Sequence, residues 1–423
     1  MFLPGSDLTP LEENIDKIIY GLTQWQPKLK ERKIKVPENF KVDGHDYGEA
    51  VANMNKLFLL NCWTDGLPIL PPTADLVSWI LTGTALSPST IIGKILPRGG
   101  IATVETLAVN LAMTGGRPEY LPVLIAAVEA IVDPAVMHQI FNATTCSVYP
   151  AVIINGPVAK QIRLGSGYGC LGPNPEYPAG GVIGRAIRLI LLNVGGAIPG
   201  RGSMAIYGGA NRYTNIIVAE DEAGLPLGWE PLNVSYFHYP RHTNTVAIHP
   251  VSSTTNIAGA SVGTPETALS TLYKFAGMMG IPNSNYWGRA ANFEGAPGIL
   301  LIARGTAQAL VKFGWSKQKM QAFLWENSKV PWSIIKNAMT PTQIKNGIEV
   351  HKNQILENEP WSITSKPENI MIVVAGGEQS GHGYWMQVGP CVKPMCKEIM
   401  LPPNWEELLE KAEKDLGPLP GAR

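Results

Sequence analysis

Five short apolar segments, each ending in glycine or in polar residues, constrain the fold of this chain more than any other feature of its 423 residues. They are 151–154, 216–219, 245–248, 298–303 and 370–375. Short runs rich in Val, Ile and Leu are typical of buried β-strands. Helical patterns lie between several of them, and strands that alternate with helices indicate an α/β sheet. We therefore predict an α/β fold with a mixed, mainly parallel sheet flanked by helices.

Helical periodicity indicates the layers that cover this sheet. Residues 103–113 place apolar side chains on one face, behind Thr103 as a suitable N-cap. Residues 118–132 are apolar nearly all round, which is typical of a buried helix. A chain of this length commonly divides into parts. The parts that we expect are an N-terminal helical arm (1–60), a first α/β lobe with a Gly-rich loop (61–260) and a second α/β lobe with a C-terminal helix (261–423).

Composition excludes several classes of partner. The chain has 34 basic and 34 acidic residues, so no net charge attracts it to nucleic acid. Its most apolar stretch, 120–132, is too short to cross a bilayer, and the N-terminus lacks the features of a secretory signal. Five cysteines, an odd number, argue against a disulfide framework. We expect a cytoplasmic protein outside the membrane, and its near-neutral surface favours a homo-oligomer.

A Gly-rich loop over 165–181 precedes a predicted helix at 182–193. Free backbone N–H groups at such a position can bind an anion, and Ser166 and Gly167 are the expected contacts. The spacing matches neither the P-loop nor the dinucleotide-binding fingerprint, so the cofactor is left open. The alternative is a tight loop that packs between neighbouring elements.

The segment 376–385, GGEQSGHGYW, follows the last predicted strand. Its glycines let the chain turn sharply and display Glu378 and His382 as an acid–base pair. Ser380 and Tyr384 would complete a pocket there. Because strand-end loops converge at one edge of an α/β sheet, we expect this loop to meet the Gly-rich loop. The alternative is a turn whose histidine bonds only to a neighbour.

Three other clusters contain residue types that can bind a metal, but none has the complete ligand pattern of a metal site. The run 220–222, Glu-Asp-Glu, could bind a cation or share a proton, and it could equally form a turn or an ion pair. His238 and His242 are spaced for one helix face, but the proline between them argues against a helix. Cys391 and Cys396 lack a second Cys or His pair. No metal site is predicted.

The segment 63–73 reads WTDGLPILPPT. Its three prolines make a rigid, extended turn that can hold Asp65 in place near the active-site loops. A strap in which Asp65 only caps a turn is the alternative.

That segment resembles the DGLPVxPPT signature of bacterial proteins related to, or encoded with, the UGSC family of (seleno)proteins. Similar segments are 96–100 with 102–106, 117–122, 183–190, and 213–222 with 229–232, so the resemblance spans about residues 60 to 390. The family's Sec/Cys-Gly-Ser-Cys tetrad implies thiol or selenol redox chemistry. This chain has only the pair Cys146-Ser147. The resemblance therefore implies a thiol- or selenol-bearing partner subunit and transfers no catalytic residue.

The leading hypothesis is an enzyme acting on a small polar or anionic metabolite. The resemblance implies cleavage or reduction of a C–S or C–N bond. Arg98 or Arg304 would clamp a carboxylate, and glycine-loop amides would stabilise an oxyanion. The expected catalytic residues are Asp65, Glu105, Glu378 and His382, and the expected substrate-binding residues are Arg98, Asn155, Ser166, Gly167, Arg304, Ser380 and Tyr384.

Two alternatives remain open at the level of sequence. One is a non-catalytic subunit that shapes the pocket of a redox partner. The other is a metal-dependent hydrolase or lyase that uses the acidic run and some of the seven histidines. If His382 has no part in turnover, the search moves to Glu220, Glu222 and His249.

Overall fold

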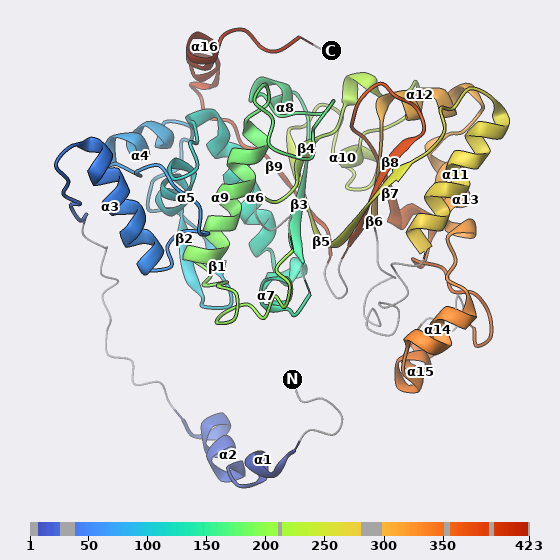
Figure 1. Cartoon of the computed structure of the whole chain (residues 1–423), viewed down its shortest axis with the longest axis horizontal. Coiled ribbons are helices and arrows are strands. Elements are labelled where there is room, and N and C mark those ends of the chain that lie inside the picture. The colour runs from blue at the N-terminus through green and yellow to red at the C-terminus, as the bar shows by residue number, and fades with distance from the viewer. Residues whose placement is uncertain are drawn as a thin grey trace.

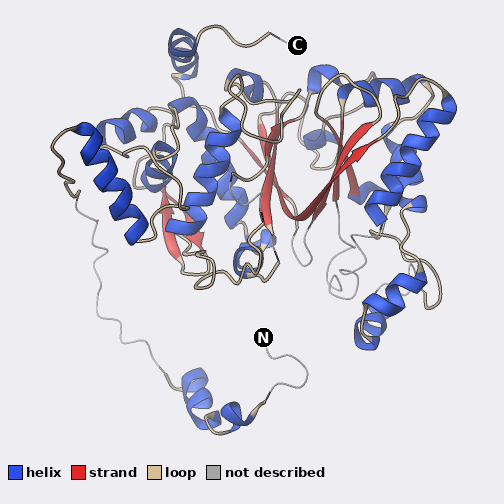
Figure 2. Cartoon of the chain, in the orientation of Figure 1, coloured by secondary structure: helices blue, strands red, loops and turns tan. Residues whose placement is uncertain are grey.

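The computed structural model describes residues 7–25, 39–146, 148–209, 214–280, 298–350, 356–388 and 393–421. A curled seven-stranded sheet lies at the centre, with helices on its outer faces (Figures 1 and 2). All five predicted segments lie at strands of this sheet. Its strands are β3 (Tyr149–Asn155), β4 (Ile217–Ala219), β5 (Thr245–Ala258), β6 (Gly298–Ile302), β7 (Ile370–Val374), β8 (His382–Val388) and β9 (Met395–Glu398).

The sheet runs in the order β4-β3-β5-β8-β6-β7, with β9 paired to β5. The pairs β3–β4 and β6–β7 are parallel, whereas β3–β5, β5–β8, β5–β9 and β6–β8 are antiparallel. The prediction of a mixed α/β sheet is confirmed, but that of a mainly parallel sheet is not. Only the short segment 375–381 separates β7 from β8. It is too short for the crossover that a parallel neighbour needs.

The described strands repeat one arrangement twice. β3, β4 and the first part of β5 have the same order and directions as β6, β7 and β8. A register shift between Val251 and Ser253 interrupts β5, and beyond it β5 pairs with β8 in the second half. β9 then returns to pair with the first part of β5. The division into two lobes stays a prediction, since β5 contributes to both halves of the sheet.

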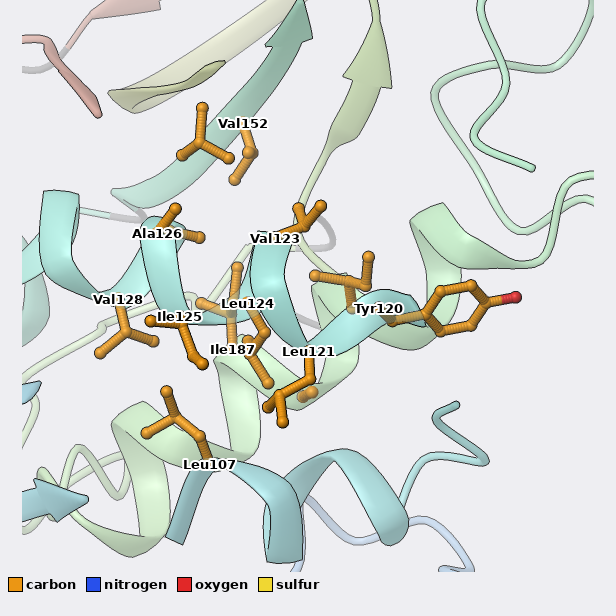
Figure 3. Close-up of a cluster of buried hydrophobic side chains, with 14 of the residues drawn as sticks. Leu107, Tyr120, Leu121, Val123, Leu124, Ile125, Ala126, Val128, Val152 and Ile187 are labelled. Atoms are coloured by element: carbon orange, nitrogen blue, oxygen red, sulfur yellow. The ribbon is translucent and has the colours of Figure 1, made fainter. Parts of the chain in front are cut away.

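Helices bury the outer faces of both halves. α6 (Leu121–Val132) and α9 (Ala179–Asn193) cover the first half, and α5 (Val104–Ala112) packs against both of these helices. Figure 3 shows Leu107, Leu124 and Ile187 of these helices and Val152 of β3 in the shared core. The predicted N-cap is confirmed, because the Thr103 hydroxyl accepts a hydrogen bond from the Thr106 N–H. α11 (Pro265–Gly280), α12 (Arg304–Lys312) and α13 (Lys317–Asn327) cover the second half.

A third core fills the space between the two inner faces. It includes Ile153, Val218, Ala247, Leu301 and Val373 from five strands. The short helix α10 (Leu232–Ser235) adds Leu232 to it. The two halves of the sheet are therefore packed face to face around an apolar interior.

The remaining described elements lie outside this sheet. β1 (Ile91–Ile95) and β2 (Gly100–Thr103) form a separate antiparallel hairpin. No helix in the described ranges is long and apolar enough to cross a membrane. The other α-helices are α1 (Thr9–Glu12), α2 (Ile15–Thr23), α3 (Tyr47–Leu60), α4 (Ala74–Leu81), α7 (His138–Ala143), α8 (Val158–Gln161), α14 (Trp332–Ala338), α15 (Pro341–Val350) and α16 (Trp405–Leu416).

Two glycines of α9 provide a matched test of this packing. A Cβ at Gly184 would lie 1.7 Å from the backbone oxygen of Thr214, whereas one at Gly181 would have its nearest neighbour, in Pro173, at 3.6 Å. We expect Gly184→Ala to lower the free energy of unfolding by roughly 2–3 kcal/mol or more, because backbone must move. Gly181→Ala should be neutral or stabilising by up to about 1 kcal/mol. Urea denaturation measures both, and equal stabilities would contradict the close approach of α9 to Thr214.

Candidate functional site

The carboxyl ends of β4 and β7 meet although these strands are the two edges of the sheet. The Asp221 N–H donates to the Val374 carbonyl at 2.8 Å. The Gly-rich loop joins both ends, because Gly165 accepts from the Ala219 N–H (3.1 Å) and Ser166 accepts from the Gly376 N–H (2.7 Å). The predicted contact between the Gly-rich loop and the loop after β7 is confirmed. That the two loops line a pocket stays a prediction.

A buried polar cluster lies at the ends of β3 and β4. Glu220 has no exposed side-chain surface. Its Oε2 accepts from the Asn155 amide (2.8 Å) and from the Leu232 N–H (2.6 Å). The same Asn155 amide donates to Glu222 Oε1 at 3.1 Å, and the Gly156 N–H donates to it at 2.6 Å. Glu220 Oε1 and Asn155 Oδ1 are buried without a hydrogen-bond partner.

Lys317, the first residue of α13, brings an ammonium group to this cluster from the second half. Its Nζ lies 3.9 Å from Glu220 Oε1, and 6% of its side chain is exposed. Nζ donates to the Glu230 carbonyl at 2.6 Å and lies 5.9 Å from the centre of the Trp229 ring. Burial raises the pKa of Glu220, although Lys317 opposes the shift. Burial has the opposite effect on the amine, because it lowers the pKa of Lys317.

Arg304 is committed to a different set of contacts from those the sequence predicts. Its Nε and Nη2 donate to the Asp221 carboxylate at 2.6 and 3.1 Å, and its Nη1 donates to Glu378 at 3.1 Å. Gly305 must be glycine, because a Cβ there would lie 1.7 Å from the Glu378 carbonyl oxygen. The guanidinium therefore joins the β4 end to the β7 end. Using it as a carboxylate clamp would require an ion pair to break.

The predicted site residues that follow β7 form hydrogen bonds with different parts of the protein rather than with one another. The Ser380 hydroxyl accepts from the Val262 N–H (2.9 Å), and the Tyr384 hydroxyl donates to Thr254 (2.9 Å). His382 exchanges hydrogen bonds with the Thr306 hydroxyl through its backbone, and its side chain is exposed. No described contact joins Glu378 to His382. Their pairing as acid and base stays a prediction.

Other predicted residues lie elsewhere. Asp65 forms a two-bond ion pair with Arg185 of α9, both bonds being 2.9 Å. Arg98, in the β1–β2 turn, and Glu105, in the first turn of α5, are exposed. Figure 1 places the hairpin at the lower left, whereas α8 and α12, which follow β3 and β6, lie at the top. Arg98 therefore does not join the strand-end cluster, and Asp65 is held to a helix instead. Gly167 lies in the Gly-rich loop with open space around it.

The three carboxylates of the acidic run each accept hydrogen bonds from other parts of the protein. Among the described residues no group of three or more His, Cys, Asp or Glu side chains could hold a metal ion. His238 and His242 have positive φ angles in a loop, as the intervening proline suggests. Cys391 lies outside the described residues, so its relation to Cys396 stays open. Burial raises the pKa of both Cys170 and Cys396 to about 12, which keeps these thiols protonated.

A cavity of about 300 Å³ lies apart from the polar cluster. Arg163 lines it and donates to the carbonyls of Gly417 and Pro418 in the C-terminal tail. None of its lining residues belongs to the cluster around Glu220. Its lining is Arg163, Pro175, Glu176, Pro178, Leu416, Pro418, Pro420 and Gly421.

No family model, no curated protein and no solved structure matches this chain. The resemblance to UGSC-related proteins therefore depends on the sequence motifs alone. Function has to be argued from the chemistry of the site, because a fold alone does not imply an activity.

The Asp65–Arg185 pair predicts a pH-dependent loss of stability. Burial alone would raise the pKa of Asp65, but the hydrogen bonds and charge of Arg185 outweigh it, and the pKa is lowered. We expect Asp65→Asn to lower the free energy of unfolding by about 1–3 kcal/mol at pH 7. The difference from the wild type should persist above the ordinary aspartate pKa of 3.8 and vanish as the pH falls through the lowered value. Urea denaturation across this range measures it, and a constant difference would contradict the pairing.

His249 should make the stability of the protein sensitive to acid at a higher pH than the Asp65–Arg185 pair does. Its side chain is fully buried, neither ring nitrogen has a hydrogen-bond partner, and burial lowers its pKa to about 3. Below about pH 6.5 His249 binds a proton in the unfolded chain but stays neutral in the folded protein. The free energy of unfolding therefore falls as the pH drops toward 3. His249→Leu should flatten this part of the stability curve. A slope identical to that of the wild type would show that His249 is already protonated or solvated.

Proposed function

We propose that this chain is an enzyme for a small polar or anionic metabolite and that Glu220 transfers a proton during its reaction. One observation carries the proposal: Glu220 is fully buried at a strand end, and its Oε1 has no hydrogen-bond partner. Buried carboxyl oxygens in folded proteins are normally satisfied. A buried carboxyl group whose pKa is shifted by burial beside a charged partner is a candidate for a functional site, and Lys317 is that partner here.

The surroundings of Glu220 suit a general acid. Two donors, Asn155 and the Leu232 N–H, fix Oε2, so the carboxyl group cannot rotate freely. Burial raises its pKa, the effect by which enzymes keep a carboxylic acid protonated near neutral pH. As a general acid it should lose activity as the pH rises through that pKa.

Substrate would reach this group when the segment after β4 moves. Residues 223–231 cover the cluster, since Trp229 and Glu230 lie on Lys317 and Leu232 bonds to Glu220. Gly228 has a positive φ, and Leu227 is almost fully exposed. Leu225 and Trp229 pack against the core of the second half, so opening would begin at the exposed tip around Leu227 and Gly228.

The bond that reacts is proposed from the resemblance alone. Cleavage or reduction of a C–S or C–N bond, with the thiol or selenol supplied by a partner subunit, is consistent with protonated thiols at Cys170 and Cys396. The same observation favours one second candidate. In that candidate the chain is a non-catalytic subunit that shapes the pocket of the redox partner.

Solvent exchange tests the proposed proton transfer to carbon, because the group that donates a proton as an acid in one direction removes it as a base in the reverse direction. The purified chain would be incubated in D₂O with a panel of small hydroxy, oxo, amino and thio acids, and loss of C–H signals followed by NMR. We expect exchange into at least one compound. Glu220→Gln, which preserves the shape of the side chain, should slow it by about 100-fold or more.

Glu407→Gln is the matched control, because Glu407 is exposed and lies on α16 rather than at the strand ends. It should exchange like the wild type. His382→Ala, in the same assay, tests the role that the sequence predicts for that residue. Full exchange by a folded Glu220→Gln variant would reject Glu220, and activity that arises only with a copurified thiol subunit would support the second candidate.

A further inference from the structure

Lys317 is placed as a reacting amine rather than as a simple counter-ion. Its nearest Glu220 oxygen is 3.9 Å away, too far for a hydrogen bond. Instead, Nζ donates a hydrogen bond to a neutral carbonyl, that of Glu230 at 2.6 Å. A lysine kept for a structural ion pair would be expected to touch its carboxylate directly.

We infer that Lys317 forms an imine with the carbonyl carbon of a small aldehyde or ketone, and that Glu220 supplies the proton that releases water. The inference rests on the proposed function of Glu220 and names the substrate class of the same site. It adds the role of nucleophile to the site and assigns it to Lys317 of α13, the helix that covers the second half of the sheet.

The step balances with the groups that are present. The neutral amine of Lys317 adds to the carbonyl carbon, and one proton moves from nitrogen to oxygen to give a carbinolamine. Glu220, as the carboxylic acid, protonates the hydroxyl group, which leaves as water. The products are a protonated imine on Lys317 and the Glu220 carboxylate, so the new charges are opposite and adjacent. No oxidant, reductant or metal is required.

Asn155 provides the remaining contact for this intermediate. Its Oδ1 is buried and has no partner, while its amide nitrogen holds Glu220 Oε2. A carbinolamine hydroxyl is a hydrogen-bond donor, so it can satisfy Oδ1 beside the acid that protonates it. An aldehyde or ketone is the class of small molecule that turns the amine, the acid and the amide oxygen into one reaction site.

The protonation states required for the step agree with the surroundings. Addition needs a neutral amine, and burial lowers the pKa of Lys317. It also needs a protonated acid, and burial raises the pKa of Glu220. Because Trp229 and the Glu230 carbonyl cover Nζ, opening of residues 223–231 should limit the rate of reaction.

Reductive trapping tests the inference on the intact chain. The protein would be incubated at pH 7 with sodium cyanoborohydride and either propanal, a neutral carbonyl probe, or pyruvate, an anionic one. Hydride reduction converts the imine to a stable secondary amine that peptide mass spectrometry locates. Lys319 is the matched control, because it lies two residues further along α13 and is exposed. We expect at least about tenfold more adduct on Lys317 than on Lys319, since exposed lysines are protonated at pH 7.

Three variants sharpen the result. Lys317→Met should abolish the selective adduct, Lys319→Met should leave it unchanged, and Glu220→Gln should slow its formation about tenfold or more. The mapping on the wild type stands even if Lys317→Met fails to fold. Labelling of Lys317 no greater than that of Lys319, with both probes, would overturn the inference.

The same samples separate this inference from the proposed function. Glu220-dependent exchange in D₂O without an adduct on Lys317 would reject the imine and retain Glu220 as the proton-transfer group. A selective adduct that forms equally fast in Glu220→Gln would retain the amine and reject the assigned role of Glu220. A preference for pyruvate over propanal would assign an anionic substrate, and the reverse a neutral one.

Discussion

The bend in β5 is the constraint on which the rest of the structure depends. A straight strand of its 14 residues would be about 45 Å long. β3 ends beside Thr245 of β5, whereas β6 ends beside Gly383 of β8, which in turn pairs with Ile257 near the other end of β5. A straight β5 would therefore keep these carboxyl ends far apart. Instead, the register shift between Val251 and Ser253 interrupts the pairing of β5 with β8, as bulges do in curled sheets. The strand ends of the two halves thereby come within hydrogen-bonding distance.

The curl also contributes to the low-polarity surroundings that shift the pKa values of Glu220 and Lys317. The inner faces and α10 fill the space between the halves with apolar side chains. Glu220, which follows β4, and Lys317, at the start of α13, meet where the two halves adjoin, and both side chains are buried. A carboxyl and an amine in such surroundings favour their neutral forms, because burying a charge costs several kcal/mol. Direct hydrogen bonds from Asn155 and Leu232 then fix the orientation of the acid.

Local patterns in the sequence predicted five of the seven strands of the main sheet and several of the covering helices, but they missed β8 and β9. His382 and Tyr384, which we expected on a loop, lie in β8. Apolar runs that end in polar residues identified β3, β4, β6 and β7, and Thr103 marked the start of α5. The strand-end rule also predicted the contact between the two glycine loops. It failed for Arg98, because the β1–β2 hairpin is not part of the main sheet. The bonds of Arg304 to Asp221, and the approach of Lys317 to Glu220, depend on how the halves pack, which no local pattern encodes.

The pairing of β5 and β9 across the two halves of the sheet affects how the protein unfolds. The first half of the sheet contains β9, which follows β8 of the second half, and the second half contains the end of β5, which begins in the first. Each half thus lends a strand to the other, as subunits do in a strand-exchanged dimer. Unfolding of one half would expose a strand edge in its neighbour. The chain should therefore unfold as one cooperative unit, even though its sheet is built from two similar halves.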